Sequence, residues 1–168
     1  MQLLEDRILK DGKVFSGNVL KVDSFLNHQI DVKLLKAMAD ELYKEFEGAG
    51  VNKILTVEAS GIAIATMVAD RFDCPLVFAK KHKTSNLSGE VYSTVVHSYT
   101  HGVDYTVVVN KDFLKAGEKI LIVDDVISTG ESLRALEELV TKAGGEICGR
   151  MAILAEGDAT KRDDLIYL

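Results

Sequence analysis

The sequence predicts an α/β fold in which a mostly parallel, twisted sheet is flanked by helices. Apolar strand patterns and amphipathic helix patterns alternate along most of the chain, and such alternation forms βαβ units with parallel strands. The chain has 168 residues, of which 47% are hydrophobic, a size and composition typical of one globular domain. No internal repeat, linker or low-complexity segment divides the sequence. We therefore expect a single domain spanning residues 1–168.

The first half of the chain contains the patterns of three helices and two strands. Apolar spacing in LLEDRIL predicts a short amphipathic helix that ends at the following Asp-Gly pair, and a second helix is expected over about residues 32–46. The segment KILTVEASG is typical of a strand that breaks at Glu58. A helix of small residues, IAIATMVADRF, should follow Gly61, and PLVFAKK should form the next strand.

Residues 83–109 interrupt this alternation. KTSNLSGE is polar, whereas VYSTVVHSY and YTVVV are β-rich runs separated by THGVD, so we expect a flexible loop that leads into a hairpin. After it, KILIVDD is a predicted strand and ESLRALEELVTKA a helix closed by Gly144 and Gly145. EICGRMAILAE is the last predicted strand.

The composition argues against several classes of protein. With 20 Lys and Arg against 26 Asp and Glu, the formal net charge is −6, so we expect no nucleic-acid partner. The N-terminal segment has early acids and no continuous apolar run, which predicts neither a signal peptide nor a membrane partner. Cys74 and Cys148 lie far apart in apolar surroundings and are expected to be buried, reduced thiols. A cytoplasmic location is the simplest one for such a chain.

Three polar segments are expected to meet at one edge of the sheet. Ligands of α/β sheets bind beyond the carboxyl ends of the strands, where this chain has residues 58–61, 80–83 and 124–132. The second segment belongs to AKKHK, the one dense basic cluster in an acidic chain. A solvated strand end is the alternative interpretation, but a basic cluster beside two anion-binding loops favours a pyrophosphate ligand.

The third segment has the composition of a phosphate-binding loop. Ser128, Thr129 and Ser132 supply hydroxyl donors, and Gly130 lets the backbone approach an oxygen closely. The loop enters a predicted helix, and the free amides and dipole at a helix N-terminus favour an anion. We therefore expect a phosphate here.

Two adjacent carboxylates, Asp124 and Asp125, end the strand before this loop. They would repel a phosphate in direct contact, so they are expected to meet vicinal hydroxyls or a divalent cation. A sugar phosphate satisfies both demands. The alternative is that Ser128 or Thr129 merely caps the helix and the aspartates are solvated. Two acids, three hydroxyls and a glycine in so short a stretch favour the functional interpretation.

The segment ILIVDDVISTGES resembles the signature loop of the type I phosphoribosyltransferases, which bind 5-phosphoribosyl-1-pyrophosphate (PRPP). VLKVDSFLNHQID, KILTVEASGIA and VFAKKHK look like the bacterial xanthine phosphoribosyltransferases and their adenine-type relatives. The resemblance covers most of the chain. It implies the single-domain type I phosphoribosyltransferase fold, with a small N-terminal hood over residues 1–30 for base recognition and a flexible hairpin lid over residues 83–109.

The same resemblance implies the site. Asp124 and Asp125 would be the catalytic residues, holding the ribose hydroxyls directly or through Mg²⁺. Glu131 departs from the glycine often found after the Thr-Gly pair, and its side chain is expected to turn to solvent. Similar enzymes can place a lysine in a neighbouring subunit's site, which implies a homodimer. The expected PRPP contacts are Ala59, Ser60, Gly61, Lys80, Lys81, Lys83, Asp124, Asp125, Val126, Ile127, Ser128, Thr129, Gly130, Glu131 and Ser132.

The expected partner of PRPP is a purine base. Leu20 and Asn27 match positions that frame the purine in the xanthine enzymes. At the end of the last strand, enzymes for 6-oxopurines usually carry a lysine, whereas this chain has Glu156. An ionised carboxylate accepts hydrogen bonds and suits an exocyclic amine, which favours adenine. Xanthine or hypoxanthine as substrate, a regulatory PRPP-binding homologue without catalysis, and Glu156 as a solvated strand end remain the alternatives.

Overall fold

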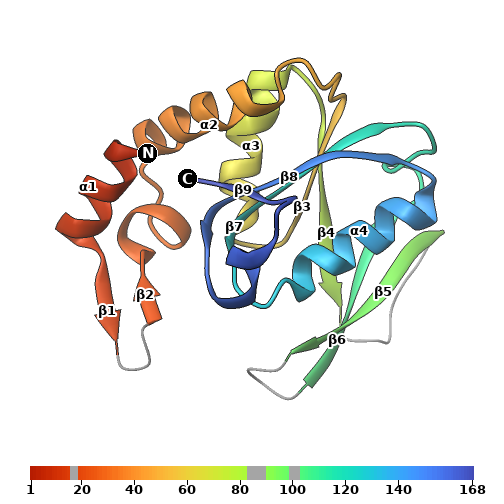
Figure 1. The fold of residues 1–168 in the computed structure, drawn as a ribbon. Coiled ribbons are helices and arrows are strands. Elements are labelled where there is room, and N and C mark those ends of the chain that lie inside the picture. Colours follow the sequence, from red (N-terminus) through yellow and green to blue (C-terminus); the bar gives the residue numbers. More distant parts are fainter. Residues whose placement is uncertain (16–18, 83–89, 99–102) are drawn as a thin grey trace.

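The computed structural model describes residues 1–15, 19–82, 90–98 and 103–168 (Figure 1). Its helices and strands follow the predicted order, with short additions near both termini. The elements are α1 (Gln2–Asp11), β1 (Lys13–Phe15), β2 (Val19–Lys21), the π-helix η1 (Asp23–Asn27), α2 (Val32–Phe46), β3 (Lys53–Val57), α3 (Gly61–Phe72), β4 (Leu76–His82), β5 (Val91–Ser98), β6 (Val103–Asn110), β7 (Lys119–Ile127), α4 (Glu131–Ala143), β8 (Glu146–Ala155), the 3₁₀ helix η2 (Gly157–Lys161) and β9 (Ile166–Tyr167).

The main sheet has the strand order β5-β6-β4-β3-β7-β8-β9. The pairs from β4 through β3, β7 and β8 to β9 are parallel, whereas β6 pairs antiparallel with both β4 and β5. The prediction of an α/β fold with a mostly parallel sheet is confirmed. In this arrangement β3 and β7 are neighbours at the centre of the sheet, so the loops at their carboxyl ends begin side by side.

The side chains of β3 and β7 point alternately to the two faces of the sheet, and helices pack against them on both faces. Leu55 and Ile122 belong to the core that packs against α4, while Ile54 and Leu121 belong to the core that packs against α2 and α3. Figure 1 shows α2 and α3 on one side of the sheet and α4 on the other. Because these central strands are covered on both faces, most of their buried residues are apolar. The buried polar residues are Lys53 and Thr56 on β3 and Asp124 and Asp125 on β7.

β7 is longer than the sequence pattern predicted. The predicted strand ended at the two aspartates, but the structure continues it through Ile127. Val126 and Ile127 pair with Leu154 and Ala155 of β8, so the ladder holds the chain extended beyond the acids. Asp124 and Asp125 consequently lie within a strand and not in a solvated loop.

The predicted hairpin is formed by β5 and β6, which pair from Val91 opposite Asn110 to Ser98 opposite Val103. One face of the hairpin packs into the core, and its β5 strand is attached to α4. The Lys142 ammonium donates to the Ser93 carbonyl at 2.7 Å. Residues 83–89 and 99–102, including Lys83, lie outside the described residues. A lid function for residues 83–109 therefore stays a prediction.

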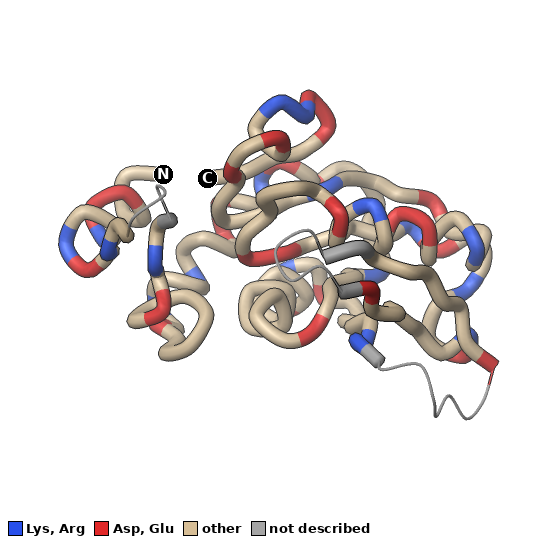
Figure 2. The backbone as a smooth tube through the Cα atoms, turned by 90° about the horizontal axis from the view of Figure 1, so that it is seen from below, with Lys and Arg blue, Asp and Glu red and all other residues tan. Residues whose placement is uncertain are grey.

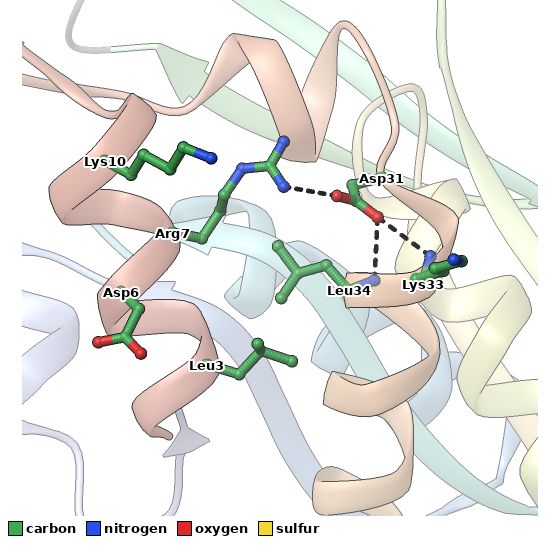
Figure 3. Close-up of a pocket in the computed structure, with 7 residues that line it drawn as sticks. All are labelled: Leu3, Asp6, Arg7, Lys10, Asp31, Lys33 and Leu34. Atoms are coloured by element: carbon green, nitrogen blue, oxygen red, sulfur yellow. Dashed lines mark hydrogen bonds and ion pairs between the residues drawn. The ribbon is translucent and has the colours of Figure 1, made fainter.

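The N-terminal elements form a small unit beside the main sheet (Figure 1). β1 and β2 pair only with each other among the described strands. The Arg7 guanidinium joins α1 to the start of α2 by donating to Asp31 at 2.6 Å, and Asp31 also accepts from the amides of Lys33 and Leu34. Figure 3 shows these groups around a pocket of about 300 Å³ between the two helices. None of the residues predicted to bind the purine lines this pocket.

Basic and acidic residues are mixed along the chain. Figure 2 shows Lys and Arg interspersed with Asp and Glu along the backbone.

Cys74 and Cys148 are free thiols, but each is half-buried where we expected full burial, because each lies near the end of an element. Burial raises the pKa of both thiols. Within the part of the chain that the structure describes, no helix has the length and apolar character needed to cross a membrane.

Candidate active site

The loop after β3 meets the carboxyl-terminal part of β7 through a hydrogen bond. The Ser60 hydroxyl donates to Asp125 Oδ1 at 2.9 Å. The Glu58 carboxylate accepts the amide of Lys81 at 2.6 Å, so the segment after β3 is in contact with both of the other predicted polar segments. Gly61 makes this approach possible, because a Cβ atom at that position would overlap the Thr56 hydroxyl and lie 2.6 Å from Asp124 Oδ1. α3 therefore begins directly against the acidic pair.

The acidic pair is buried and has few donors. Asp124 and Asp125 are 5% and 4% exposed, and Asp124 Oδ1 accepts the amide of Asp125 at 3.0 Å. Burial raises the pKa of Asp124 well above its usual value, and the neighbouring charge of Asp125 raises it further, while the charge of Lys81 acts in the opposite direction. Two buried carboxylates that repel each other are suited to receive donor groups or a cation.

The two carboxylates of Asp124 and Asp125 fit a magnesium ion whose other ligands are substrate oxygens and water. They do not form a complete metal site by themselves. No group of three or more candidate ligands that could hold a metal occurs among the described residues. Mg²⁺ is commonly bound by one or two carboxylates together with substrate oxygens and water. Asp124 and Asp125 can supply the protein's share of such a site.

The two lysines at the end of β4 lie on opposite faces of the sheet. The Lys81 ammonium lies 5.4 Å from the centre of the Tyr105 ring and is close enough to Asp124 to affect its pKa. The Lys80 ammonium lies 6.0 Å from the Phe78 ring, in a separate cleft. The structure thus brings Lys81 to the acidic pair and places Lys80 away from it, because successive residues of a strand point to opposite faces.

The phosphate-loop segment turns sharply into α4. Gly130 has a φ of 79°, a left-handed conformation that glycine adopts without strain. Ser128 and Thr129 are exposed, so their hydroxyls can contact a ligand. The Ser128 carbonyl accepts the amide of Ala159 at 3.1 Å, which fixes the start of the loop against η2.

Glu131 does not turn to solvent as the sequence predicted. Its carboxylate accepts from Arg134 Nη2 at 3.1 Å and from Arg134 Nε at 3.3 Å, and the side chain is 26% exposed. The attraction of the guanidinium one turn further along α4 explains the difference. The carboxylate is folded back along its own helix.

The residues predicted to recognise the base belong to two separate parts of the fold. Glu156 follows β8 and is half-buried, and its amide donates to the Ile127 carbonyl at 2.8 Å, so it lies beside the phosphate loop. Leu20 lies on β2 and Asn27 ends η1, both in the N-terminal unit. Among the described residues, no hydrogen bond joins Asn27 to Glu156. Their convergence on one ligand stays a prediction.

Sequence reasoning missed two groups near the acids. Tyr105 on β6 is partly buried, and burial raises the pKa of its phenol, with further contributions from the charges of Asp124 and Glu131. The Thr56 hydroxyl is fully buried without a hydrogen-bond partner among the described residues. A polar residue within the apolar strand KILTV was a signal for Thr56. No local pattern indicated Tyr105.

Comparison with known proteins identifies the family. A family profile described as "Phosphoribosyl transferase domain" matches residues 21–167. The chain belongs to the phosphoribosyltransferase family. The resemblance inferred from the signature loop is therefore confirmed, and the fold and the enzyme class follow from it.

Similar proteins in this family carry two different names. The chain is 46% identical over 166 residues to xanthine phosphoribosyltransferase 2 of Clostridium botulinum, covering 98% of this chain and 87% of the relative. It is 49% identical over 158 residues to xanthine phosphoribosyltransferase 1 of Clostridium perfringens, covering 94% and 83%. A solved structure of adenine phosphoribosyltransferase from Saccharomyces cerevisiae matches with a TM-score of 0.76 at 21% identity, covering 99% of this chain and 97% of the other. The last likeness shows the fold alone.

Proposed function

We propose that this phosphoribosyltransferase joins a purine base to the ribose of PRPP, giving a nucleoside 5′-monophosphate and pyrophosphate for purine salvage, with Mg²⁺ as cofactor. The observation that carries the proposal is the contact between Ser60 and Asp125. It joins the loop that leads into α3, which is suited to pyrophosphate, with the buried acidic pair. The hydroxyl loop that follows the acidic pair is suited to a phosphate.

Each part of the site has a distinct role in this reaction. Asp124 and Asp125 accept hydrogen bonds from the 2- and 3-hydroxyls of ribose and thereby orient the reacting carbon C1. The Thr129 hydroxyl and the amides at the start of α4 bind the 5-phosphate. Lys81 stabilises the negative charge of the departing pyrophosphate as the bond to C1 breaks. Bound Mg²⁺ would neutralise charge on the same pyrophosphate.

Adenine is the base that the chemistry of Glu156 favours. The half-buried position of Glu156 beside the phosphate loop supports base contact, and an ionised carboxylate accepts from an amine but repels a carbonyl oxygen. Xanthine is the second candidate, since the relatives at 46–49% identity are named for it. The two candidates differ in the substituent that Glu156 would meet.

A competition assay separates them. With PRPP and Mg²⁺ present, the enzyme should use adenine in preference to xanthine, hypoxanthine and guanine, and Glu156→Lys should shift the ratio toward a 6-oxopurine by about tenfold to several-hundredfold. Glu146→Lys, an exposed glutamate at the other end of β8, is the matched control. Preference for xanthine in the unmodified enzyme would make Glu156 a solvated strand end. Tight PRPP binding without turnover of any base would instead favour a regulatory protein.

We further propose a homodimer in which Lys80 serves the neighbouring subunit. Lys80 points away from its own acidic pair and lines a cleft of about 530 Å³ whose apolar walls include Phe78 and Phe113. These two rings are 40% and 59% exposed, and large exposed apolar groups in one cleft favour a protein contact. Sedimentation should give a dimer that Phe78→Asp converts to a monomer. Leu9→Asp, on the exposed face of α1, is the control, and a wild-type monomer would contradict the proposal.

A further inference from the structure

The carboxylate of Glu131 lies where the proposed function requires an anion of the substrate. Glu131 is the first residue of α4, and a carboxylate in the first turn interacts with the same positive helix end that would bind the 5-phosphate. Burial raises the pKa of Tyr105, and the charges of Asp124 and Glu131 raise it further, so Glu131 faces the same side of the sheet as the acidic pair. An unpaired carboxylate at this position would weaken phosphate binding.

Arg134 offsets this charge and is itself held from three directions. It donates twice to Glu131 and once to the Val95 carbonyl of β5 at 3.3 Å. It also lies 3.5 Å from Glu138 Oε2, and that oxygen accepts the Thr94 hydroxyl at 2.7 Å. The guanidinium is therefore fixed between the start of α4 and the hairpin.

Stability alone does not account for this arrangement. The side chain of Arg134 is 49% exposed, and ion pairs at such exposure contribute little to folding free energy. Their effect on a nearby anionic ligand is different, because a ligand carrying two negative charges meets either a neutralised pair or a free carboxylate. The consequence of losing Arg134 should appear in binding.

We propose that Arg134 is a positioning residue for the 5-phosphate of PRPP. It keeps the Glu131 carboxylate folded along α4 and offsets its charge, so that a loop carrying a carboxylate still accepts a phosphate. The inference rests on the proposed function and adds a residue to it. Arg134 acts through Glu131 and makes no contact with the substrate.

The test measures binding of ribose 5-phosphate by calorimetry and the steady-state kinetics with PRPP. Arg134→Gln should raise the Kd of ribose 5-phosphate and the KM of PRPP by about three- to thirtyfold, with little change in kcat. Adding Glu131→Gln to Arg134→Gln should restore binding, because the unpaired charge is then gone. The single variant Arg134→Lys should retain part of the wild-type affinity. Glu131→Gln alone should bind ribose 5-phosphate up to about threefold more tightly, because the opposing charge is removed. Weaker binding by this variant would mean that the carboxylate itself holds the ligand and would overturn the inference even if Arg134→Gln fails to fold.

Lys142→Gln is the matched control. Lys142 is on the same helix and, like Arg134, donates to a carbonyl of β5, that of Ser93. Its ion pair is with Glu138 and not with Glu131, so its loss should leave the Kd of ribose 5-phosphate unchanged. Normal binding by Arg134→Gln, or a double variant as weak as Arg134→Gln, would overturn the inference. Failure of the unmodified enzyme to bind ribose 5-phosphate would overturn the proposed function instead.

Discussion

Asp124→Asn should make the protein more stable and less active. The aspartate is 5% exposed, and the hydrogen bond that it accepts comes from the adjacent backbone amide. Asparagine has the same shape and can accept that bond, but it removes a buried charge next to Asp125. Removing an inadequately compensated buried charge is worth about 1–3 kcal/mol or more. For a chain of this length, that corresponds to a rise in Tm of about 2–12 °C.

The stabilisation of Asp124→Asn relative to the wild type should increase with rising pH. The pKa of Asp124 is raised in the folded protein, so the folded state binds this proton more tightly than the unfolded chain does. The free energy of unfolding therefore falls as pH rises from about 4, the usual value for aspartate, through the raised folded pKa. Asparagine does not titrate. The stability difference between variant and wild type should grow across that range and disappear below it.

Calorimetric melting in EDTA, with kinetics in Mg²⁺, tests both halves of the prediction. The kcat/KM for PRPP should fall by more than about tenfold, because a neutral amide cannot replace the carboxylate that we propose to face ribose or metal. Asp112→Asn, whose carboxylate is 80% exposed, should change stability by less than about 0.5 kcal/mol. A destabilised Asp124→Asn variant, or one with full activity, would refute the reasoning.

Three further substitutions test the other parts of the site. Thr129→Val removes one exposed hydroxyl and should weaken ribose 5-phosphate binding by about 1–3 kcal/mol; equal affinity in calorimetry would contradict the phosphate assignment. Lys81→Ala should raise the KM for PRPP more than that for the base, by a factor that decreases at high salt because the lost contribution is electrostatic; equal effects on both substrates would place Lys81 elsewhere. Gly61→Ala brings a methyl group against Thr56 and Asp124 and should cost about 1–3 kcal/mol of stability; an unchanged Tm would show that α3 can shift.

The sequence predicted the sheet and the acidic pair because both depend on short-range patterns. Alternation of strands and helices indicated the fold, and Asp124 and Asp125 stood out at the end of an apolar run. The two lysines show a different limit: the sequence analysis assigned both Lys80 and Lys81 to PRPP, whereas the structure places them on opposite faces of the sheet. Lys81 lies beside Tyr105 on the side of the acidic pair.

Long-range pairing explains what could not be predicted. Tyr105 approaches Lys81 because β6 pairs antiparallel with β4, with Lys81 opposite Val107, and no local pattern specifies that register. The Glu131 and Arg134 pair had helical spacing in the sequence, yet its orientation depends on the Val95 carbonyl of the hairpin. The relation of Leu20 and Asn27 to the rest of the site depends likewise on tertiary packing.

The hydrogen bonds from Glu156 to Ile127 and from Ala159 to Ser128 have a consequence for the redesign of this enzyme. They connect the segment after β8 directly to the start of the phosphate loop. Glu156, the residue that would determine base specificity, is therefore attached to the backbone that would hold the ribose phosphate. A new base preference introduced at Glu156 should therefore also change the KM for PRPP. Directed evolution toward another purine should accumulate compensating substitutions in residues 157–161 as well as in the base pocket.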